Sequence, residues 1–185
     1  LDLKLVKVID THIHADHFSG LNELANQTNC SKIMGEQSAS EVLDVRVKDN
    51  EKIKIENIEL VSMYTPGHTD CSYSFLMKDR IFTGDTLLIN GTGRTDFQNG
   101  NPSHQYESLF NKILKLPEKT LVYPAHEYNG IKVSTIGNEK KNNPRLQVKS
   151  SEQYIKIMSN LNLSSPKMMD IAISANIKGL TLNQI

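Results

Sequence analysis

Cysteine is scarce in this sequence of 185 residues, which contains two, Cys30 and Cys71. They lie far apart and in no CxxC pattern, which argues against a secreted disulfide scaffold and fits a reducing compartment. We expect both thiols to be buried and to pack as small apolar side chains.

Long apolar runs and an excess of charge of one sign are also absent. No apolar stretch approaches the roughly 20 residues that cross a bilayer, and residues 1–10 lack the apolar block of a signal peptide. Lysine plus arginine equals aspartate plus glutamate at 21 each, so no overall field attracts nucleic acid or an anionic membrane. We therefore expect a soluble protein that acts on a small molecule, with no nucleic-acid partner and no membrane partner.

Repeats, low-complexity tracts and Pro/Gly/Ser linkers are missing too, so nothing marks a domain boundary. The length suits one domain, and we expect residues 1–185 to form it. The first half is dominated by strand-like runs, with one helical segment over residues 21–26. The predicted strands cover residues 4–9, 45–47, 52–56, 58–64, 73–77 and 80–83.

The hydrophobic period changes in the second half. Asn101 is a candidate N-cap with Pro102 at the first helical position, and apolar residues follow at helical spacing as far as Leu114. A short strand over residues 120–123 and a second helix that opens at Ser151 come next. Strands covered by helices predict a layered α/β fold.

Histidine is rare as well, with six in the chain, yet His12, His14 and His17 fall within six residues together with Asp16. The segment follows a strand-like run that ends at Ile9, so it should be a loop at the end of a strand. Imidazoles and carboxylates placed there can converge on one cation. The alternative is a surface loop with solvated histidines.

Three further candidate ligands lie where a strand-like run gives way to a loop, namely His68, Asp85 and His126. A single residue of this kind is more often an ordinary turn residue. Four strand ends that all carry metal-ligand types favour a metal site. Gly67 and Gly84 strengthen this interpretation, because glycine allows backbone geometry and close approach that other residues resist.

The order of these motifs resembles the metallo-β-lactamase superfamily. The sequence has His-x-His-x-Asp-His from His12, Pro-Gly-His-Thr around His68, Gly-Asp-Thr around Asp85 and Pro-Ala-His at His126. The superfamily implies a four-layer αββα sandwich with the metal site at the edge between two sheets, but the fold alone does not determine the reaction. Its members normally begin with further strands, so we expect this chain to lack the first amino-terminal strands and to be less stable than a complete homologue.

Finer motifs resemble one family within the superfamily, the persulfide dioxygenases. Residues 91–98, GTGRTDFQ, match its Gly-Cys-Gly-Arg-Thr-Asp-Phe-Gln stretch with Thr92 in place of a frequent cysteine. YPAHEY at residues 123–128 and NPRL at residues 143–146 match as well, and the likeness extends to Ala172. The resemblance implies oxidation of glutathione persulfide by O2 to sulfite and glutathione.

The same resemblance implies a cofactor of one Fe(II) per chain, held by His12, His68 and Asp85. Two histidines and one carboxylate form the facial triad of ferrous oxygenases, which leaves open positions for the persulfide sulfur and for O2.

The other motif residues would surround this ion without binding a metal themselves. These catalytic candidates are His14, Asp16, His17 and His126, which would orient the ligands and hydrogen-bond the reacting species. The alternative is a second metal site, with Asp85 bridging two ions.

Glutathione carries two carboxylates, so cationic and phenolic groups near the metal are candidate anchors. Arg145 and Tyr128 match positions near the thiol pocket of the family, and Arg94 lies in the loop that follows Asp85. A structural role for Arg94, paired with Asp96, is an equal possibility.

The main rival function is a glyoxalase II-like hydroxyacylglutathione hydrolase with two zinc ions per chain. The GRTDFQ and NPRL motifs argue against it. A silent binding module is disfavoured because every ligand position is present, and a nuclease because the neutral chain has no basic stripe. Relatives imply a homodimer, located in the cytoplasm of a bacterium or in the mitochondrial matrix if the source is eukaryotic.

Overall fold

The computed structural model describes residues 3–128 and 130–185, whose strands form two sheets. Residues 1, 2 and 129, which the expected single domain includes, lie outside the described residues. The smaller sheet is parallel and has the order β1-β2-β3. Its strands are β1 (Lys7–Ile9), β2 (Ser31–Gly35) and β3 (Val45–Val47).

The larger sheet is mixed and has the order β4-β5-β6-β7-β8-β9. Its strands are β4 (Lys52–Ile55), β5 (Ile58–Tyr64), β6 (Tyr73–Leu76), β7 (Arg80–Gly84), β8 (Leu121–Pro124) and β9 (Ser134–Thr135). Neighbouring strands are antiparallel except for β7 and β8, which are parallel because a helical crossover joins them. Strands β5, β7 and β8 therefore run in one direction, and their carboxyl ends share one edge of the sheet.

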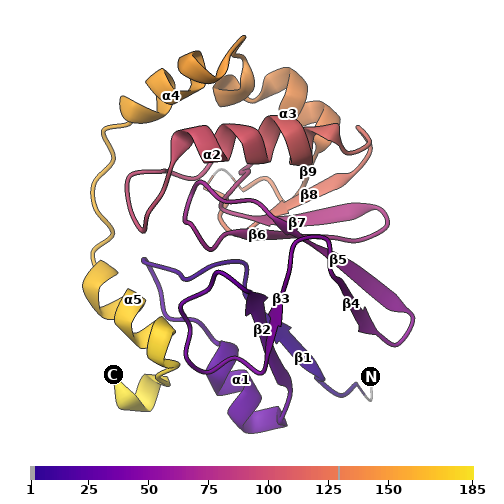
Figure 1. Cartoon of the computed structure of the whole chain (residues 1–185), viewed down its shortest axis with the longest axis vertical. Coiled ribbons are helices and arrows are strands. Elements are labelled where there is room, and N and C mark those ends of the chain that lie inside the picture. Colours follow the sequence, from indigo (N-terminus) through magenta and orange to yellow (C-terminus); the bar gives the residue numbers. More distant parts are fainter. Residues whose placement is uncertain (1–2, 129) are drawn as a thin grey trace.

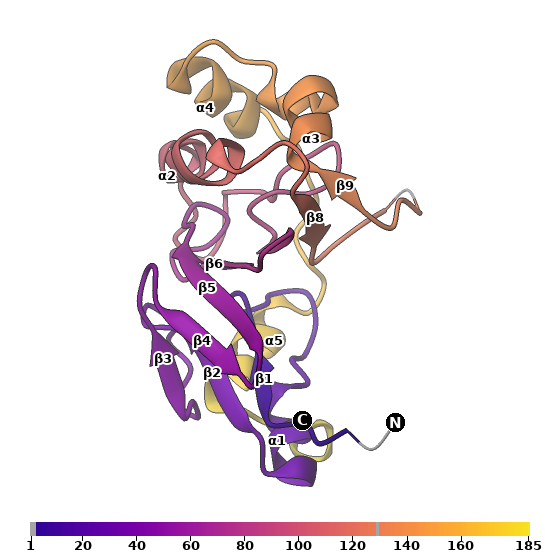
Figure 2. The same ribbon diagram turned by 90° about the vertical axis from the view of Figure 1, so that its right-hand side faces the viewer.

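Helices cover the outer faces of the two sheets, as Figures 1 and 2 show. Helices α1 (Leu21–Thr28) and α5 (Met169–Lys178) lie beside the smaller sheet. Helices α2 (Pro102–Glu107), α3 (Ile136–Asn142) and α4 (Ser151–Ser159) lie over the larger sheet. This arrangement confirms the predicted four-layer αββα sandwich.

Shorter helical segments complete the chain. A π-helical turn over Ser108–Lys112 and a 3-10 turn over Ile113–Lys115 extend α2, and further 3-10 turns span Pro144–Leu146 and Leu182–Gln184. Among the described helices, none combines the length and the apolar character that a membrane span requires.

Three clusters of buried apolar side chains fill the spaces between the layers. The cluster under α2 and α4 includes Ile81, Leu109, Ile113, Val122 and Tyr154. The cluster between the sheets includes Ile33, Val47, Leu60 and Phe75, and that beside α1 and α5 includes Ile13, Leu21, Met34 and Cys71. Each fully buried aliphatic side chain contributes roughly 1.5–3 kcal/mol.

Several expectations about local structure are confirmed. The Asn101 side chain caps α2 by accepting hydrogen bonds from the backbone N–H groups of Ser103 and His104. Helix α4 begins at Ser151, and Cys30 and Cys71 are both buried.

Other elements differ from the sequence-based expectations. The strand predicted over residues 4–9 is shorter and begins at Lys7. Strands β2 and β9 and helices α3 and α5 were not predicted. The α5 sequence, MDIAISANIK, spreads apolar residues around the helix, so its period is weak.

Candidate metal centre

Three side chains from separate loops converge at the edge between the two sheets. His12 follows β1 in the smaller sheet, whereas His68 and Asp85 follow β5 and β7 in the larger one. One potential ligand atom from each lies within 4.8 Å of those from the other two. His12 and Asp85 are buried and His68 is partly buried. The topology thus brings together the three residues that the sequence assigned as metal ligands.

Hydrogen bonds hold the two imidazole rings of this triad. His68 Nδ1 lies 2.8 Å from the carbonyl oxygen of Arg94. Because a carbonyl only accepts, His68 donates this hydrogen bond from Nδ1, which leaves Nε2, 3.6 Å from Asp85 Oδ2, as the ring atom that faces the triad. His12 Nδ1 lies 2.9 Å from Thr11 Oγ1. Both rings are therefore oriented by partners outside the triad.

The other four motif residues lie beside the triad. His14, Asp16 and His17 form a second group whose ligand atoms also lie within 4.8 Å of one another. His126 joins the two groups, because its Nδ1 is 2.7 Å from Asp85 Oδ1 and its Nε2 is 2.9 Å from Asp16 Oδ2.

Burial and charge set the protonation states of these histidines. Burial, reinforced by neighbouring histidines, holds the pKa of His12 well below its usual value and lowers that of His14 to about 4. The hydrogen bond with Asp85 raises the pKa of His126 to about 9. At neutral pH the two buried imidazoles are neutral, the form that binds metals, whereas His126 is protonated.

These side chains fit a transition-metal ion. Nδ1 of His14 is buried and has no hydrogen-bond partner among residues 3–128 and 130–185. An orphaned buried polar atom costs roughly 1–3 kcal/mol, so its presence beside the other imidazoles points to a ligand. Imidazoles with carboxylates suit iron and zinc.

Glycines allow the loops to approach the centre closely. Gly67 and Gly84 have positive φ angles of 140° and 53°, as expected from their positions before His68 and Asp85. Gly93 is more restricted, because a Cβ atom there would lie 2.1 Å from the Asp85 carbonyl oxygen and 2.9 Å from His68 Nδ1. Gly93 lies within the GTGRTDFQ motif, but the motif itself does not indicate this close approach.

A cavity of about 440 Å³ opens beside the triad. His68, Asp85 and His126 contribute to its lining at the metal centre, and the predicted substrate residues Arg94, Tyr128 and Arg145 also line it.

These three substrate candidates differ in the hydrogen bonds that they already make within the protein and in their exposure. Arg94 makes hydrogen bonds of 2.6 and 2.7 Å to the Asp96 carboxylate and one of 2.7 Å to the Ser164 carbonyl, which favours its structural role. The Arg145 guanidinium donates only to the carbonyl and hydroxyl oxygens of Thr92 and has no carboxylate partner in the described structure. Burial lowers the pKa of Arg145. Tyr128 is 79% exposed, and its ring stacks on that of His126.

A buried polar network that the sequence did not predict lies beneath the Gly91–Gln98 loop. The Tyr154 hydroxyl donates to Gln105 Oε1 at 2.8 Å, and Gln105 Nε2 donates to the Gly93 carbonyl at 3.1 Å. Tyr154 lies in the helix that the sequence predicted to open at Ser151, but no pattern there indicated its hydroxyl bond. The network supports the loop whose Arg94 carbonyl holds His68.

Comparisons with known proteins identify relatives of this chain in sequence and in fold. The family model of the metallo-beta-lactamase superfamily matches residues 2–54 and 37–126. The mitochondrial persulfide dioxygenase ETHE1 of Mus musculus is 41% identical over 181 residues, which cover 96% of this chain and 70% of that protein. The crystal structure of ETHE1 from Myxococcus xanthus superposes with a TM-score of 0.93 at 45% identity, covering 95% of this chain and 78% of that one.

A protein that carries the name of the rival function is also similar to this chain. A hydroxyacylglutathione hydrolase of Dictyostelium discoideum is 36% identical over 135 residues, covering 69% of this chain and 50% of that protein. Both its identity and its coverage are lower than those of the dioxygenase.

Proposed function

This chain belongs to the persulfide dioxygenase family of the metallo-β-lactamase superfamily, and from that premise we propose that it oxidises glutathione persulfide with O2 to sulfite and glutathione. The terminal sulfur gains both oxygen atoms of O2 and is oxidised as O2 is reduced. Water supplies the third oxygen of sulfite, and cleavage of the S–S bond returns glutathione as the thiol. The convergence of His12, His68 and Asp85 beside a cavity that also contains Arg145 is the observation that carries the proposal.

We assign the metal as one Fe(II) held by His12, His68 and Asp85. When bound, this ion supplies the redox chemistry that allows O2 to react with sulfur. Three protein ligands would leave such an ion able to bind two further small ligands, which the proposed reaction requires.

His126 acts on the triad through Asp85. Its protonated ring bridges the Asp85 and Asp16 carboxylates, so it holds Asp85 in one orientation and offsets part of the negative charge. His14 and His17 line the same side of the centre and are the candidates to hydrogen-bond the reacting water.

Substrate binding falls to other residues that line the cavity. Arg145 presents a guanidinium that is partly desolvated and lacks a carboxylate partner, so a carboxylate of glutathione is a matching ligand. Tyr128 stands at the exposed rim, where its ring and hydroxyl can contact the peptide part of the thiol.

The experiment combines metal analysis with two activity assays. Protein purified without added metal should contain about one iron per chain and consume O2 when glutathione persulfide is added. Two zinc ions per chain, together with hydrolysis of S-lactoylglutathione and no persulfide-dependent O2 uptake, would instead establish the rival hydrolase.

We also propose that the protein is a homodimer, located in the cytoplasm of a bacterium or in the mitochondrial matrix of a eukaryote. The mitochondrial relative from Mus musculus supports the second location for a eukaryotic source. Sedimentation equilibrium of the purified protein tests the dimer.

A further inference from the structure

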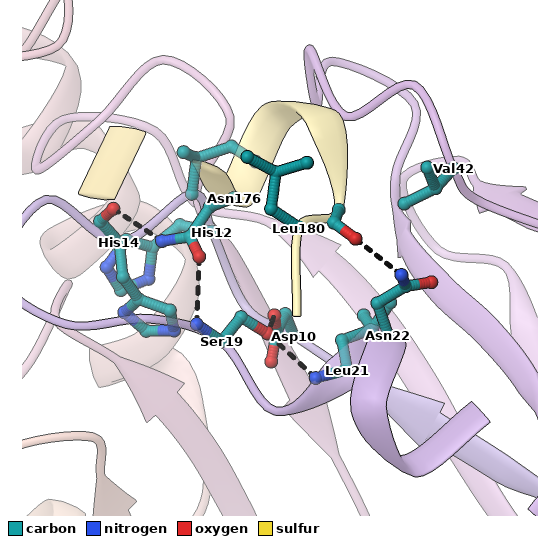
Figure 3. A pocket seen from close by; sticks show the side chains of 11 residues that line it. Asp10, His12, His14, Ser19, Leu21, Asn22, Val42, Asn176 and Leu180 are labelled. Atoms are coloured by element: carbon teal, nitrogen blue, oxygen red, sulfur yellow. Dashed lines mark hydrogen bonds between the residues drawn. The ribbon is translucent and has the colours of Figure 1, made fainter. Parts of the chain in front are cut away.

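The side chain of Asn176, in α5, is hydrogen-bonded to the loop that follows β1 (Figure 3). We call residues 12–19 the ligand loop. Asn176 of α5 donates a hydrogen bond of 2.9 Å from Nδ2 to the backbone carbonyl of His14. The same Nδ2 donates to the backbone carbonyl of His17, also at 2.9 Å. Its Oδ1 accepts a hydrogen bond of 2.8 Å from the backbone N–H of Ser19. A single amide therefore satisfies three backbone groups of the loop.

The ligand loop depends on contacts of this kind. In the described part of the chain, no backbone–backbone hydrogen bond involves residues 12–19. Side chains hold its backbone instead, since the Ile13 N–H donates to Cys71 Sγ at 3.4 Å and the Ile13 carbonyl accepts from Gln98 Nε2 at 2.8 Å. Beyond Ile13, Asn176 makes the contacts. Backbone N–H and carbonyl groups outside helices and sheets need such hydrogen-bond partners if the loop is to keep a single conformation.

Helix α5 is packed against the protein core, so it fixes the position of the Asn176 side chain. Ala172 and Ala175 are buried, and Ile173 and Ile177 pack against the cluster that includes Ile13. These residues lie within four positions of Asn176, so the packed part of the helix carries its side chain directly.

The contacts of Asn176 continue to the metal triad. The carbonyls of His14 and His17 flank Asp16, whose carboxylate pairs with His126 at 2.9 Å. His126 in turn holds the Asp85 carboxylate. A shift of the loop between residues 14 and 17 would therefore move Asp16 and release one side of Asp85.

We propose that Asn176 is a positioning residue for the metal centre, acting through the ligand loop, a role that rests on the proposed metal site but not on the identity of the substrate. Its amide determines where His14, Asp16 and His17 stand relative to the triad. Helix α5 is thus part of the centre, although it contributes no ligand.

Asn176→Ala tests the role, and Asn22→Ala is the matched control. Asn22 Nδ2 donates to the Gly179 carbonyl just beyond α5, so its loss weakens the docking of the same helix without touching the ligand loop. Chelator competition under anaerobic conditions gives the Fe(II) dissociation constant of each protein. We expect Asn176→Ala to weaken binding by roughly 10- to 100-fold, as for other side chains that orient ligands. Asn22→Ala should lower the thermal midpoint but keep the wild-type constant.

Asn176→Asp is a second, isosteric variant that keeps the proposal testable if the alanine variant does not fold. It retains an acceptor for the Ser19 N–H but loses both donors, so it should also weaken Fe(II) binding. In metal-free protein, hydrogen exchange of the Ser19 amide should accelerate in Asn176→Ala and remain slow in Asn176→Asp. An effect on helix packing alone would change the exchange rate of the Ser19 amide equally in the two variants.

The outcomes distinguish this inference from the proposed function. Fe(II) affinity of Asn176→Ala and Asn176→Asp equal to that of Asn22→Ala would overturn the positioning role while leaving the dioxygenase assignment intact. A wild-type protein that binds no Fe(II) would overturn both.

Discussion

The Nδ1 atom of His126 lies 2.7 Å from Oδ1 of Asp85. A carboxylate at neutral pH only accepts hydrogen bonds, so the proton of this contact stays on the imidazole. This pair links the triad to the other motif residues, because the second ring nitrogen of His126 contacts the Asp16 carboxylate.

The first prediction concerns the pH dependence of this pair in metal-free protein. The hydrogen bond with Asp85 raises the pKa of His126 to about 9, above the value of roughly 6.5 for an unfolded histidine. Its contribution to stability should therefore be complete below about pH 6.5 and disappear as the pH rises through about 9. NMR titration of the imidazole signals, with unfolding midpoints measured across the same range, checks this.

His126→Gln is the control for that titration, because it should remove the signal that titrates near pH 9 and flatten the alkaline loss of stability. His14 is an internal contrast, since burial lowers its pKa to about 4. A His126 ring that titrates near 6.5 in the metal-free wild type would show that the pair does not form.

The second prediction concerns His68, one of the three proposed metal ligands. His68→Ala should reduce the iron content from about one per chain to almost none, because two ligands do not retain the ion, while the circular dichroism spectrum stays unchanged. Elemental analysis after gel filtration measures the loss. His104→Ala is the matched control, since His104 is exposed on α2 and should keep its iron. Full iron content in His68→Ala would remove His68 from the ligand set.

The third prediction concerns the close approach at Gly93. A methyl group there meets the Asp85 carbonyl at 2.1 Å, so the loop must move away from both Asp85 and His68. A displacement of about 1 Å at a reacting centre can cost about 100-fold in turnover, and we expect a loss of that order in Gly93→Ala, measured as O2 uptake. Gly91→Ala lies in the same loop and meets only Leu88 Cβ at 3.9 Å, so it should be nearly silent. Equal activities would contradict the steric argument.

The fourth prediction concerns substrate binding by Arg145. A charge-assisted hydrogen bond contributes roughly 1.5–3 kcal/mol, so Arg145→Ala should raise KM for glutathione persulfide about 10- to 100-fold with a smaller effect on kcat. Arg145→Lys should recover only part of this, because an ammonium cannot form the two-pronged contact. Steady-state O2 uptake measures both constants.

Arg80→Ala is the control for charge, because Arg80 pairs with Asp79 and lies outside the cavity lining. An unchanged KM in Arg145→Ala would assign Arg145 to holding Thr92 alone. A parallel loss of kcat would place its effect on the chemical step and not on binding.

Local patterns in the sequence were sufficient for the outline of the fold and the set of candidate ligands. Strand-like runs that end before His12, His68, Asp85 and His126 are read directly from alternation and turn residues, and carboxyl ends of strands that run in one direction share an edge. The capped helix at Asn101 was predictable for the same reason, since its signal lies within four residues.

The role of Arg94 could not be predicted from local patterns in the sequence. Its sequence position allowed either substrate contact or a pair with Asp96, and the choice depended on where the guanidinium points. The folded chain places it against Asp96 and the Ser164 carbonyl, 70 residues away.

By itself, then, the sequence determined which side chains can bind the metal, because imidazoles and carboxylates are distinctive residues at distinctive strand ends. Only the tertiary structure decided how they are held. Asn176 reaches the carbonyls of His14 and His17 across 162 and 159 residues. Every residue carries such a carbonyl, so no pattern of residue types reveals which one a distant amide will meet until the chain has folded.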